Sequence, residues 1–241
     1  MKNRRADLFL GSDIGLWALG EVSPEEILRV YTLDAAIAET ASGRGFEVFT
    51  SNANEADVPK GEMGLSVHYP VVFTPEFIAG YRAIYNLHPG YLPWGRGFYP
   101  VFWAIWEQTP AGATLHEVTS GVDKGPIVAQ IRVDPLSSES GGDLHLRVRD
   151  AEKAIFREYW PALRDGKRLR SRPQGSGGTW HTRREFLQLK QGAHWRDMRG
   201  EDLIRLIRAL TFDGFSGLEV ELGDNWFHVR LERLRKEPEI R

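Results

Sequence analysis

The chain has 241 residues, and its 31 lysines and arginines against 33 aspartates and glutamates give a formal net charge of −2, which supplies no long-range attraction to nucleic acid. Hydrophobic residues make up 41% and charged residues 27%, which excludes a disordered chain, and the absence of cysteine excludes disulfides and thiolate chemistry. No apolar run approaches the roughly 20 residues that span a bilayer, and the one after Asp7 is too short for a signal-peptide core, so we expect a cytoplasmic protein with no membrane or nucleic-acid partner.

Short apolar segments alternate with helical segments along the first half of the chain. Strands are predicted at residues 6–11, 27–33, 46–50, 64–69 and 83–87, and helices at residues 34–42 and 74–79. The first strand is expected to run into a turn over Gly11, Ser12 and Asp13. Because successive strand–helix–strand units pair in parallel through right-handed crossovers, the pattern predicts an α/β fold, a Rossmann-like domain with a parallel-rich sheet.

The second half of the chain is predicted to end in a smaller unit. Helices are predicted at residues 100–107, 143–163 and 202–210, strands at 113–118 and 126–133, and a β-hairpin from 218–222 and 226–231. Proline and glycine interrupt a basic stretch at residues 168–182, which indicates a boundary or a mobile loop. We therefore expect a Rossmann-like domain over residues 1–185 and a small C-terminal helix and β-hairpin subdomain over residues 186–241.

The residues most suited to chemistry follow the fifth predicted strand. Asn86 and His88 are two positions apart, so their side chains leave the same face of that strand. They stand at the carboxyl end of a parallel strand, where open α/β sheets place ligands, and a loop rich in proline and glycine follows. For an isolated pair, capping of a strand end is the alternative interpretation.

Asp123 lies in a turn between two later predicted strands. Alone it would be an ordinary turn residue. Together with Asn86 and His88 it supplies a carboxylate beside an amide donor and an imidazole that titrates near neutral pH. Acyl transfer to an amine needs those functions, because an oxyanion must be stabilised and the attacking nitrogen must lose a proton.

Three spaced motifs carry a family resemblance. An Asn-x-His with Leu-Pro, Arg-Gly and Pro spans residues 86–100, Gly-x-Thr-x-His spans 112–116, and a Val-Asp-x-Gly-x-Ile turn lies within 122–130. In that order they resemble the N10-formyltetrahydrofolate-dependent formyltransferases. The resemblance is continuous over residues 64–130 and looser elsewhere.

The resemblance implies a catalytic trio of Asn86, His88 and Asp123. By analogy Asn86 donates to the oxyanion, His88 accepts the proton or helps bind the oxyanion, and Asp123 positions His88 and relays a proton. Lys124 departs from the family pattern, in which many relatives have threonine, and this change would alter contacts with the folate.

Size and C-terminal pattern are most similar to nucleotide-sugar N-formyltransferases. The resemblance then implies N10-formyltetrahydrofolate as donor, no metal, and an amino sugar carried on a nucleotide, dTDP-4-amino-4,6-dideoxyglucose being favoured. It also implies a homodimer and a role in O-antigen or other surface glycans. A formyltransferase for another small-molecule amine, and a catalytically silent folate- or nucleotide-binding protein of this fold, remain as alternatives.

Binding residues are expected around the trio. The candidates for the folate are His68, Tyr69, Leu92, Val122 and Lys124, and those for the sugar nucleotide are Ser12, Asp13, Arg96, Tyr99 and Phe215. Several of these candidates have an alternative interpretation without a ligand. His68 fits a place in the core equally well, and Ser12 and Asp13 would only form a turn. Arg96 would be an ordinary solvent-exposed side chain. His116 is predicted to be structural although it belongs to a motif. A dinucleotide site is disfavoured because residues 11–15 lack the Gly-x-Gly-x-x-Gly spacing.

Overall fold

A seven-stranded sheet organises the part of the chain that the computed structural model describes, residues 6–55, 61–191 and 195–233. Its spatial order is β3 (Val48–Phe49), β2 (Val30–Thr32), β1 (Ala6–Leu10), β4 (Met63–Val67), β5 (Ala83–His88), β7 (Gly112–Glu117) and β8 (Ile127–Arg132). The strands from β3 to β5 pair in parallel, whereas β7 and β8 pair antiparallel. The predicted Rossmann-like, parallel-rich α/β fold is therefore confirmed.

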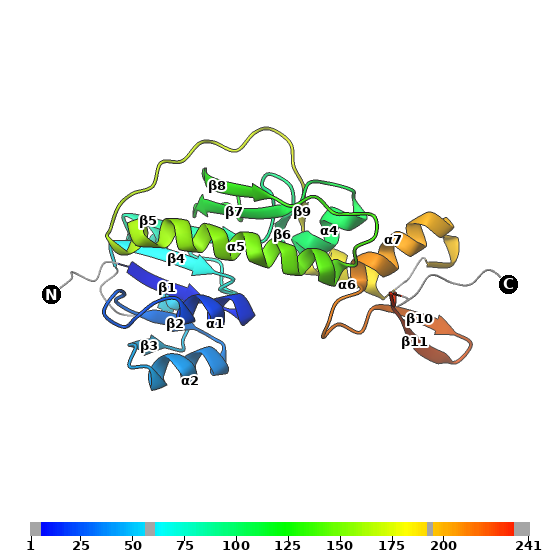
Figure 1. Ribbon diagram of the computed structural model, residues 1–241, viewed down its shortest axis with the longest axis horizontal. Helices are drawn as coiled ribbons and strands as arrows, with labels where there is room; N and C mark the ends of the chain where they lie inside the picture. The colour runs from blue at the N-terminus through cyan, green and yellow to red at the C-terminus, as the bar shows by residue number, and fades with distance from the viewer. Residues whose placement is uncertain (1–5, 56–60, 192–194, 234–241) are drawn as a thin grey trace.

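The central strands are short apolar runs because both of their faces are covered. Every residue of β1 and of β4 is buried. On one face, an aromatic cluster gathers around Phe9, with Tyr31, Phe73 and Phe77. On the other, the long helix α5 (Gly141–Arg164) crosses the sheet (Figure 1). Strands β2 and β3 are shorter than the sequence predicts.

The remaining helices of the α/β body connect and cover these strands. They are α1 (Ser12–Gly20), α2 (Ala35–Gly43), the short α3 (Pro75–Ala79) and α4 (Pro100–Trp106), with a 3₁₀ turn, η1 (Ala53–Glu55). Among the described residues, no helix combines the length and the apolar character needed to cross a membrane.

The expected turn after the first strand is wrong, because helix α1 begins at Ser12. Gly15 and Gly20 interrupt the helical pattern of this segment in the sequence. The structure explains Gly15, since a Cβ there would lie 3.2 Å from the Leu10 Cβ and 3.4 Å from an Ile37 methyl group. The glycine lets α1 pack closely on β1 and α2, and the two candidate residues Ser12 and Asp13 occupy the first turn of a helix.

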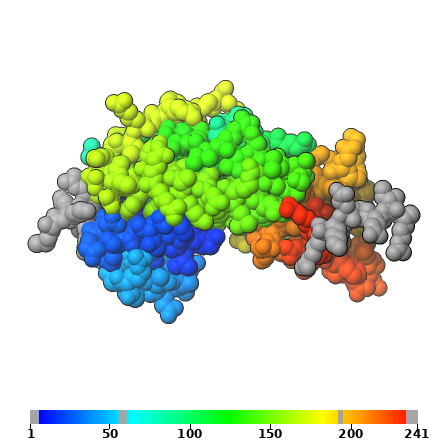
Figure 2. Space-filling view, viewed as in Figure 1, coloured from blue at the N-terminus to red at the C-terminus, as the bar shows by residue number. Residues whose placement is uncertain are grey.

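The C-terminal segment extends from one end of the α/β body (Figure 2). It consists of α6 (Arg183–Lys190), η2 (Trp195–Asp197), α7 (Gly200–Leu210) and the hairpin of β10 (Leu218–Leu222) and β11 (Asn225–Val229). Phe186, Leu206 and Leu218 are buried in the same apolar cluster as the inner strands. The division at residue 186 stays a prediction.

Residues 168–182 join α5 to the C-terminal segment and are called the strap below. In Figure 1 the strap runs along the outer edge of the sheet beside β8. Arg172 forms an antiparallel bridge with Ile127, and the strap ends in β9 (Trp180–His181), which pairs with β6 (Arg96–Gly97). This stretch, predicted as a boundary or a mobile loop, is bonded to the loop that follows Asn86 and His88, and its role as a boundary stays a prediction.

Candidate active site

The structure brings Asn86, His88 and Asp123 together. Asn86 and His88 lie at the end of β5, and Asp123 lies in the turn between β7 and β8. The Asn86 Nδ2 donates to Asp123 Oδ1 over 3.5 Å, and His88 Nδ1 lies 3.7 Å from Asp123 Oδ2. Both separations are long for a direct hydrogen bond.

The hydrogen bonds of His88 define its protonation. Its Nε2 lies 2.8 Å from the carbonyl oxygen of Gly95, which only accepts, so Nε2 carries a proton and Nδ1 faces Asp123. The side chain is buried, and burial lowers the pKa of His88 more than the nearby Asp123 carboxylate raises it. The imidazole is therefore neutral, with its basic nitrogen directed at the carboxylate.

Asp123 is held as a carboxylate. Burial raises the pKa of its carboxyl group, but the imidazoles of His88 and His116 when protonated, and a hydrogen bond from the Gly97 N–H, lower that pKa well below its usual range. The turn that carries Asp123 is tightly built. Asp123 has a φ of +52°, and a Cβ on Gly125 would lie 1.6 Å from the carbonyl oxygen of Glu117, so only glycine fits there.

His116 is a fourth member of this group and was missed as such by sequence reasoning. It pairs with Asn86 across β5 and β7, and its Nδ1–H donates to the Glu117 carbonyl over 2.8 Å. Its Nε2 can then accept from Asn86 Nδ2 at 3.2 Å. His116 thereby fixes which end of the Asn86 amide faces the trio. The available signal was the Gly-x-Thr-x-His motif at residues 112–116.

A second polar group, the α5 charge cluster, is formed by Asp13, His68, Arg149 and Glu152. Glu152 is fully buried and lies 2.7 Å from His68 Nε2 and 3.0 Å from Arg149 Nη1. The other arm of Arg149 donates to Asp13 Oδ1 over 2.5 Å. Ser12 Oγ is 3.4 Å from His68 Nδ1. The predicted binding residues Ser12, Asp13 and His68 thus meet in this cluster. Arg149 and Glu152 lie beside them, although the charged pattern of their helix would predict solvent exposure.

The other predicted binding residues are dispersed. Tyr69 is buried in the aromatic cluster, where its hydroxyl accepts from the Ala53 N–H, and Leu92 is buried under the loop. Val122 and Lys124 are exposed on the turn that holds Asp123.

Tyr99 and Phe215 come together around Phe186. Tyr99 stacks on Phe186 with ring centroids 3.9 Å apart, and Phe215 meets Tyr99 edge-on at 6.3 Å. The Arg96 guanidinium donates to Gln174 of the strap.

A cavity of about 1140 Å³ lies away from the trio, between α4, α7 and the start of α5. Its walls mix arginines with acidic side chains, and neither the trio nor the α5 charge cluster lines it. No set of three potential metal ligands is assembled within residues 6–55, 61–191 and 195–233.

Comparisons with known proteins bear on this site. A family model described as formyl transferase matches residues 47–159, a range that includes Asn86, His88 and Asp123. The dTDP-4-amino-4,6-dideoxyglucose formyltransferases of Mycobacterium bovis and Mycobacterium tuberculosis are 34% identical to this chain over 159 residues, which cover 66% of this chain and 67% of theirs.

Solved structures share the fold. A 4-N formyltransferase from Francisella tularensis superposes with a TM-score of 0.82 at 18% identity, covering 97% of this chain and 99% of its own. An N-formyltransferase from Helicobacter canadensis, solved in complex with folinic acid and dTDP-3-aminofucose, superposes with a TM-score of 0.74 at 14% identity, covering 88% and 82%. At these identities the likeness establishes the architecture alone.

Proposed function

Because this chain belongs to the formyl transferase family, we propose that it is a sugar N-formyltransferase. It moves a formyl group from N10-formyltetrahydrofolate to the amine of a nucleotide-linked amino sugar. The observation that carries the proposal is the meeting of Asn86, His88 and Asp123 at the end of β5, inside the region that the family model matches.

The chemistry of these side chains fits a formyl donor. When bound, N10-formyltetrahydrofolate supplies an electrophilic formyl carbon. Transfer to an amine needs a hydrogen-bond donor for the developing oxyanion and an acceptor for the amine proton. Asn86 Nδ2 becomes such a donor when the oxyanion replaces its long, 3.5 Å contact with Asp123 Oδ1 while the other N–H stays on His116. The neutral His88 is such an acceptor.

The orientation of His88 assigns the proton's path. Its Nε2–H is held by the Gly95 carbonyl, so an incoming proton is accepted at Nδ1. There it lies between the imidazole and the Asp123 carboxylate, which is ionised and 3.7 Å away. Asp123 therefore stabilises the imidazolium that forms and can pass the proton onward.

We assign the substrate side of the site to the predicted nucleotide-sugar residues. Ser12 and Asp13 begin α1, next to Arg149 of the α5 charge cluster, and Arg96 follows the trio's strand. Tyr99 and Phe215 supply aromatic surface. The predicted folate residues, His68, Tyr69, Leu92, Val122 and Lys124, keep that proposed role, with Val122 and Lys124 exposed beside Asp123.

The proposed acceptor is dTDP-4-amino-4,6-dideoxyglucose, the sugar in the names of the mycobacterial relatives. The Helicobacter canadensis complex supports a dTDP carrier and a folate donor. We place the reaction in the cytoplasm, as a step toward O-antigen or a similar surface glycan.

The test is the mass of the product. Purified protein is incubated with N10-formyltetrahydrofolate and a panel of dTDP- and GDP-linked 3-amino and 4-amino sugars. One formylated sugar at catalytic yield supports the proposal and identifies the acceptor. A formylated small-molecule amine from a second panel would favour the wider alternative, and donor binding without any product would favour a silent binding protein.

The acid limb of the activity profile should lie below the usual histidine range. Burial lowers the pKa of His88, so the imidazole stays neutral and able to accept a proton at pH values below the ordinary pKa of about 6.5. As pH falls through the lowered pKa, His88 becomes protonated and the rate declines. The profile of kcat is measured with both substrates saturating, because kcat/KM also reports ionisation of the free acceptor amine. An acid limb of kcat at or above about 6.5 would contradict this assignment.

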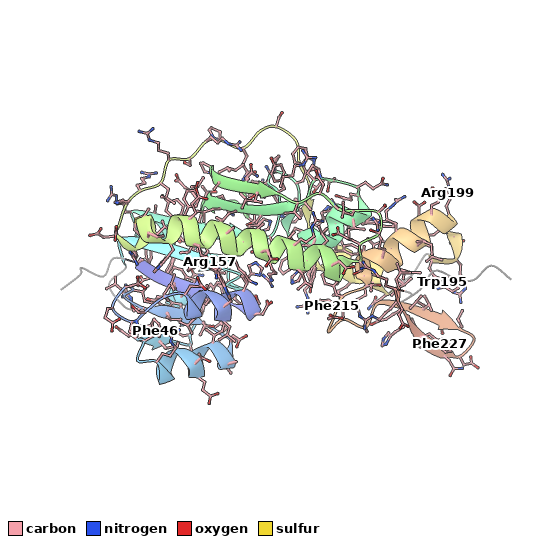
Figure 3. The ribbon with its side chains drawn as sticks, viewed as in Figure 1. Phe46, Arg157, Trp195, Arg199, Phe215 and Phe227 are labelled. Carbon is pink, nitrogen blue, oxygen red and sulfur yellow. The ribbon has the colours of Figure 1, made fainter. Side chains whose placement is uncertain are left out.

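The hairpin offers the surface for the proposed homodimer. Within the part of the chain that the structure describes, strands β10 and β11 pair only with each other, and the outer half of the hairpin exposes Leu222, Trp226 and Phe227. Figure 3 shows Phe227 on the projecting hairpin, away from Phe215 at its base. Trp226 and Phe227 are consecutive residues of β11, so their side chains point to opposite faces of the hairpin. Each face therefore offers an apolar side chain that a second copy, related by a two-fold axis, could cover.

Trp226→Asp should convert the dimer to a monomer. Trp226 is 62% exposed in the single chain, and burying an aspartate in a two-fold contact places two charges there. Light scattering after size-exclusion chromatography measures the mass. Val72→Asp changes a residue that is 66% exposed outside the hairpin and should leave the mass unaltered. A monomeric wild-type protein, or a dimeric Trp226→Asp variant, would refute the hairpin interface.

A further inference from the structure

Gln174 joins two parts of the active site through its side-chain amide. Nε2 donates to the carbonyl oxygens of Asp123 and Gly125, over 2.7 and 2.8 Å. Oε1 accepts from the Arg96 Nε and Nη2, over 3.1 and 2.7 Å. One side chain of the strap thus bonds both the turn that carries the trio's carboxylate and the arginine that follows the trio's strand.

Only one orientation of the Gln174 amide satisfies these partners. Two carbonyl oxygens require a donor on one side, and a guanidinium requires an acceptor on the other. An alkyl side chain meets neither need, and a carboxylate of the same shape meets only the second, because it accepts hydrogen bonds and cannot donate them. The arrangement therefore specifies glutamine by its chemistry.

The loop that carries Arg96 is also bonded directly to the Asp123 side chain. Gly97, next to Arg96, donates its N–H to Asp123 Oδ2 over 2.9 Å. The Arg96–Gly97 strand and the Asp123 turn are therefore linked twice, once through the carboxylate and once through Gln174. Since Asp123 has a positive φ, its carboxylate direction depends on how the backbone of this turn is held.

We propose that Gln174 is a positioning residue that fixes the Asp123 carboxylate against His88 and, with the same amide, orients Arg96 toward the anionic part of the acceptor. The inference rests on the proposed function and deepens it. Gln174 uses the Nε and Nη2 edge of the guanidinium, so a phosphate would meet Arg96 at Nη1. Gln174 thereby couples acceptor binding to proton transfer without touching either reactant.

The strap has anchors of its own on both sides of Gln174. The backbone of Arg172 exchanges hydrogen bonds of 2.7 and 2.8 Å with Ile127. Thr179 Oγ1 accepts from the Gly95 N–H over 2.9 Å, and the Thr179 carbonyl accepts from the Arg96 N–H over 3.1 Å. Removing the Gln174 side chain therefore tests the amide and leaves the path of the strap intact.

Gln174→Ala should lower kcat about 10-fold and raise KM for the nucleotide sugar, because Asp123 and Arg96 both lose a fixed position. Gln174→Glu keeps an acceptor for Arg96 but sets an oxygen against two carbonyls. The kcat of Gln174→Glu should fall as far as that of the alanine variant, whereas its KM for the nucleotide sugar should stay closer to the wild-type value. Gln188→Ala, the same change on the exposed face of α6, serves as the matched control and should alter neither constant.

Imidazole titration by NMR supplies the readout that a purely structural role would not move. Asp123 raises the pKa of His88, while burial, His116 and the more distant His68 lower it. If the Asp123 carboxylate moves away in Gln174→Ala, the His88 pKa should fall below that of the wild type and of Gln188→Ala.

These measurements separate the two proposals. Absence of product from the wild-type protein would refute the proposed function, and the titration, which needs no turnover, would still decide the role of Gln174. An unchanged His88 pKa in Gln174→Ala would overturn the inference. So would a loss of thermal stability in that variant with kcat, KM and the pH profile preserved.

Discussion

Replacing His88 by alanine should lower kcat by a factor on the order of 10² to 10⁴ with the nucleotide sugar and the formyl donor both saturating. The variant loses the basic Nδ1 that lies 3.7 Å from Asp123 Oδ2. The other imidazole at this carboxylate, His116, lies 3.5 Å from Oδ1 and also contacts Asn86, so it does not occupy the place of His88. Asn86→Ala should lower kcat by about 10² to 10³, the usual loss for one oxyanion donor. Initial rates of tetrahydrofolate release give both values.

The two variants are interpretable only if the fold is retained. His88 is buried and bonded to Gly95, so each variant also needs a thermal melt and a titration with the formyl donor. We expect donor binding within a few-fold of the wild type, because the change removes a proton acceptor and not the architecture of β5. Wild-type kcat in a folded His88→Ala, Asn86→Ala double variant would refute the catalytic assignment.

The trio could be predicted because its members depend on local rules. Strand β5 is an apolar run that ends where Pro89 and Gly90 cannot continue it, and alternation then puts Asn86 and His88 on one face. The β7–β8 turn could be predicted from its flanking strands. Such signals locate the ends of strands. In an open α/β sheet the carboxyl ends of the parallel strands lie along one edge, which is where ligands bind.

The parts that sequence reasoning missed depend on contacts between distant segments. Arg149 and Glu152 lie on a helix of many charges, and they are buried because α5 packs over the sheet, where they meet His68 and Asp13. Helix α1 was not predicted because Gly15 weakens the helical pattern of its sequence. The structure shows that glycine is needed there for close packing on β1. The strap resembles a linker in composition, and its hydrogen bonds to residues 93–127 cannot be inferred from proline and glycine content.

Glu152→Gln should lower the free energy of unfolding by about 3 kcal/mol, the low end of the usual cost of breaking a buried ion pair by removing one partner. Glutamine keeps the shape, but it leaves the buried Arg149 with Asp13 as its remaining carboxylate and removes the charge that faces His68. Urea unfolding measures the loss. Glu158→Gln, on the exposed face of the same helix, is the matched control and should change stability little.

The pH dependence of that loss identifies its origin. Burial raises the pKa of Glu152, but His68 and Arg149 lower it more, so the folded-state pKa lies below the ordinary value of about 4.3. A depressed carboxyl pKa contributes stability that is fully present above the unfolded value and is lost as pH falls through the folded value. The difference between wild type and Glu152→Gln should therefore be largest at neutral pH and shrink below about pH 4.3.

The same substitution also tests whether the α5 charge cluster belongs to the acceptor side of the site. Arg149 contacts Asp13 in the first turn of α1, so a displaced Arg149 should raise KM for the nucleotide sugar. The affinity for the formyl donor should fall less, because His68 is the one member of the cluster assigned to the folate. Equal losses of both affinities would remove the cluster from the acceptor side. A stability equal to that of Glu158→Gln at neutral pH would show that Arg149 and His68 are satisfied without the Glu152 charge, and would refute the ion-pair argument itself.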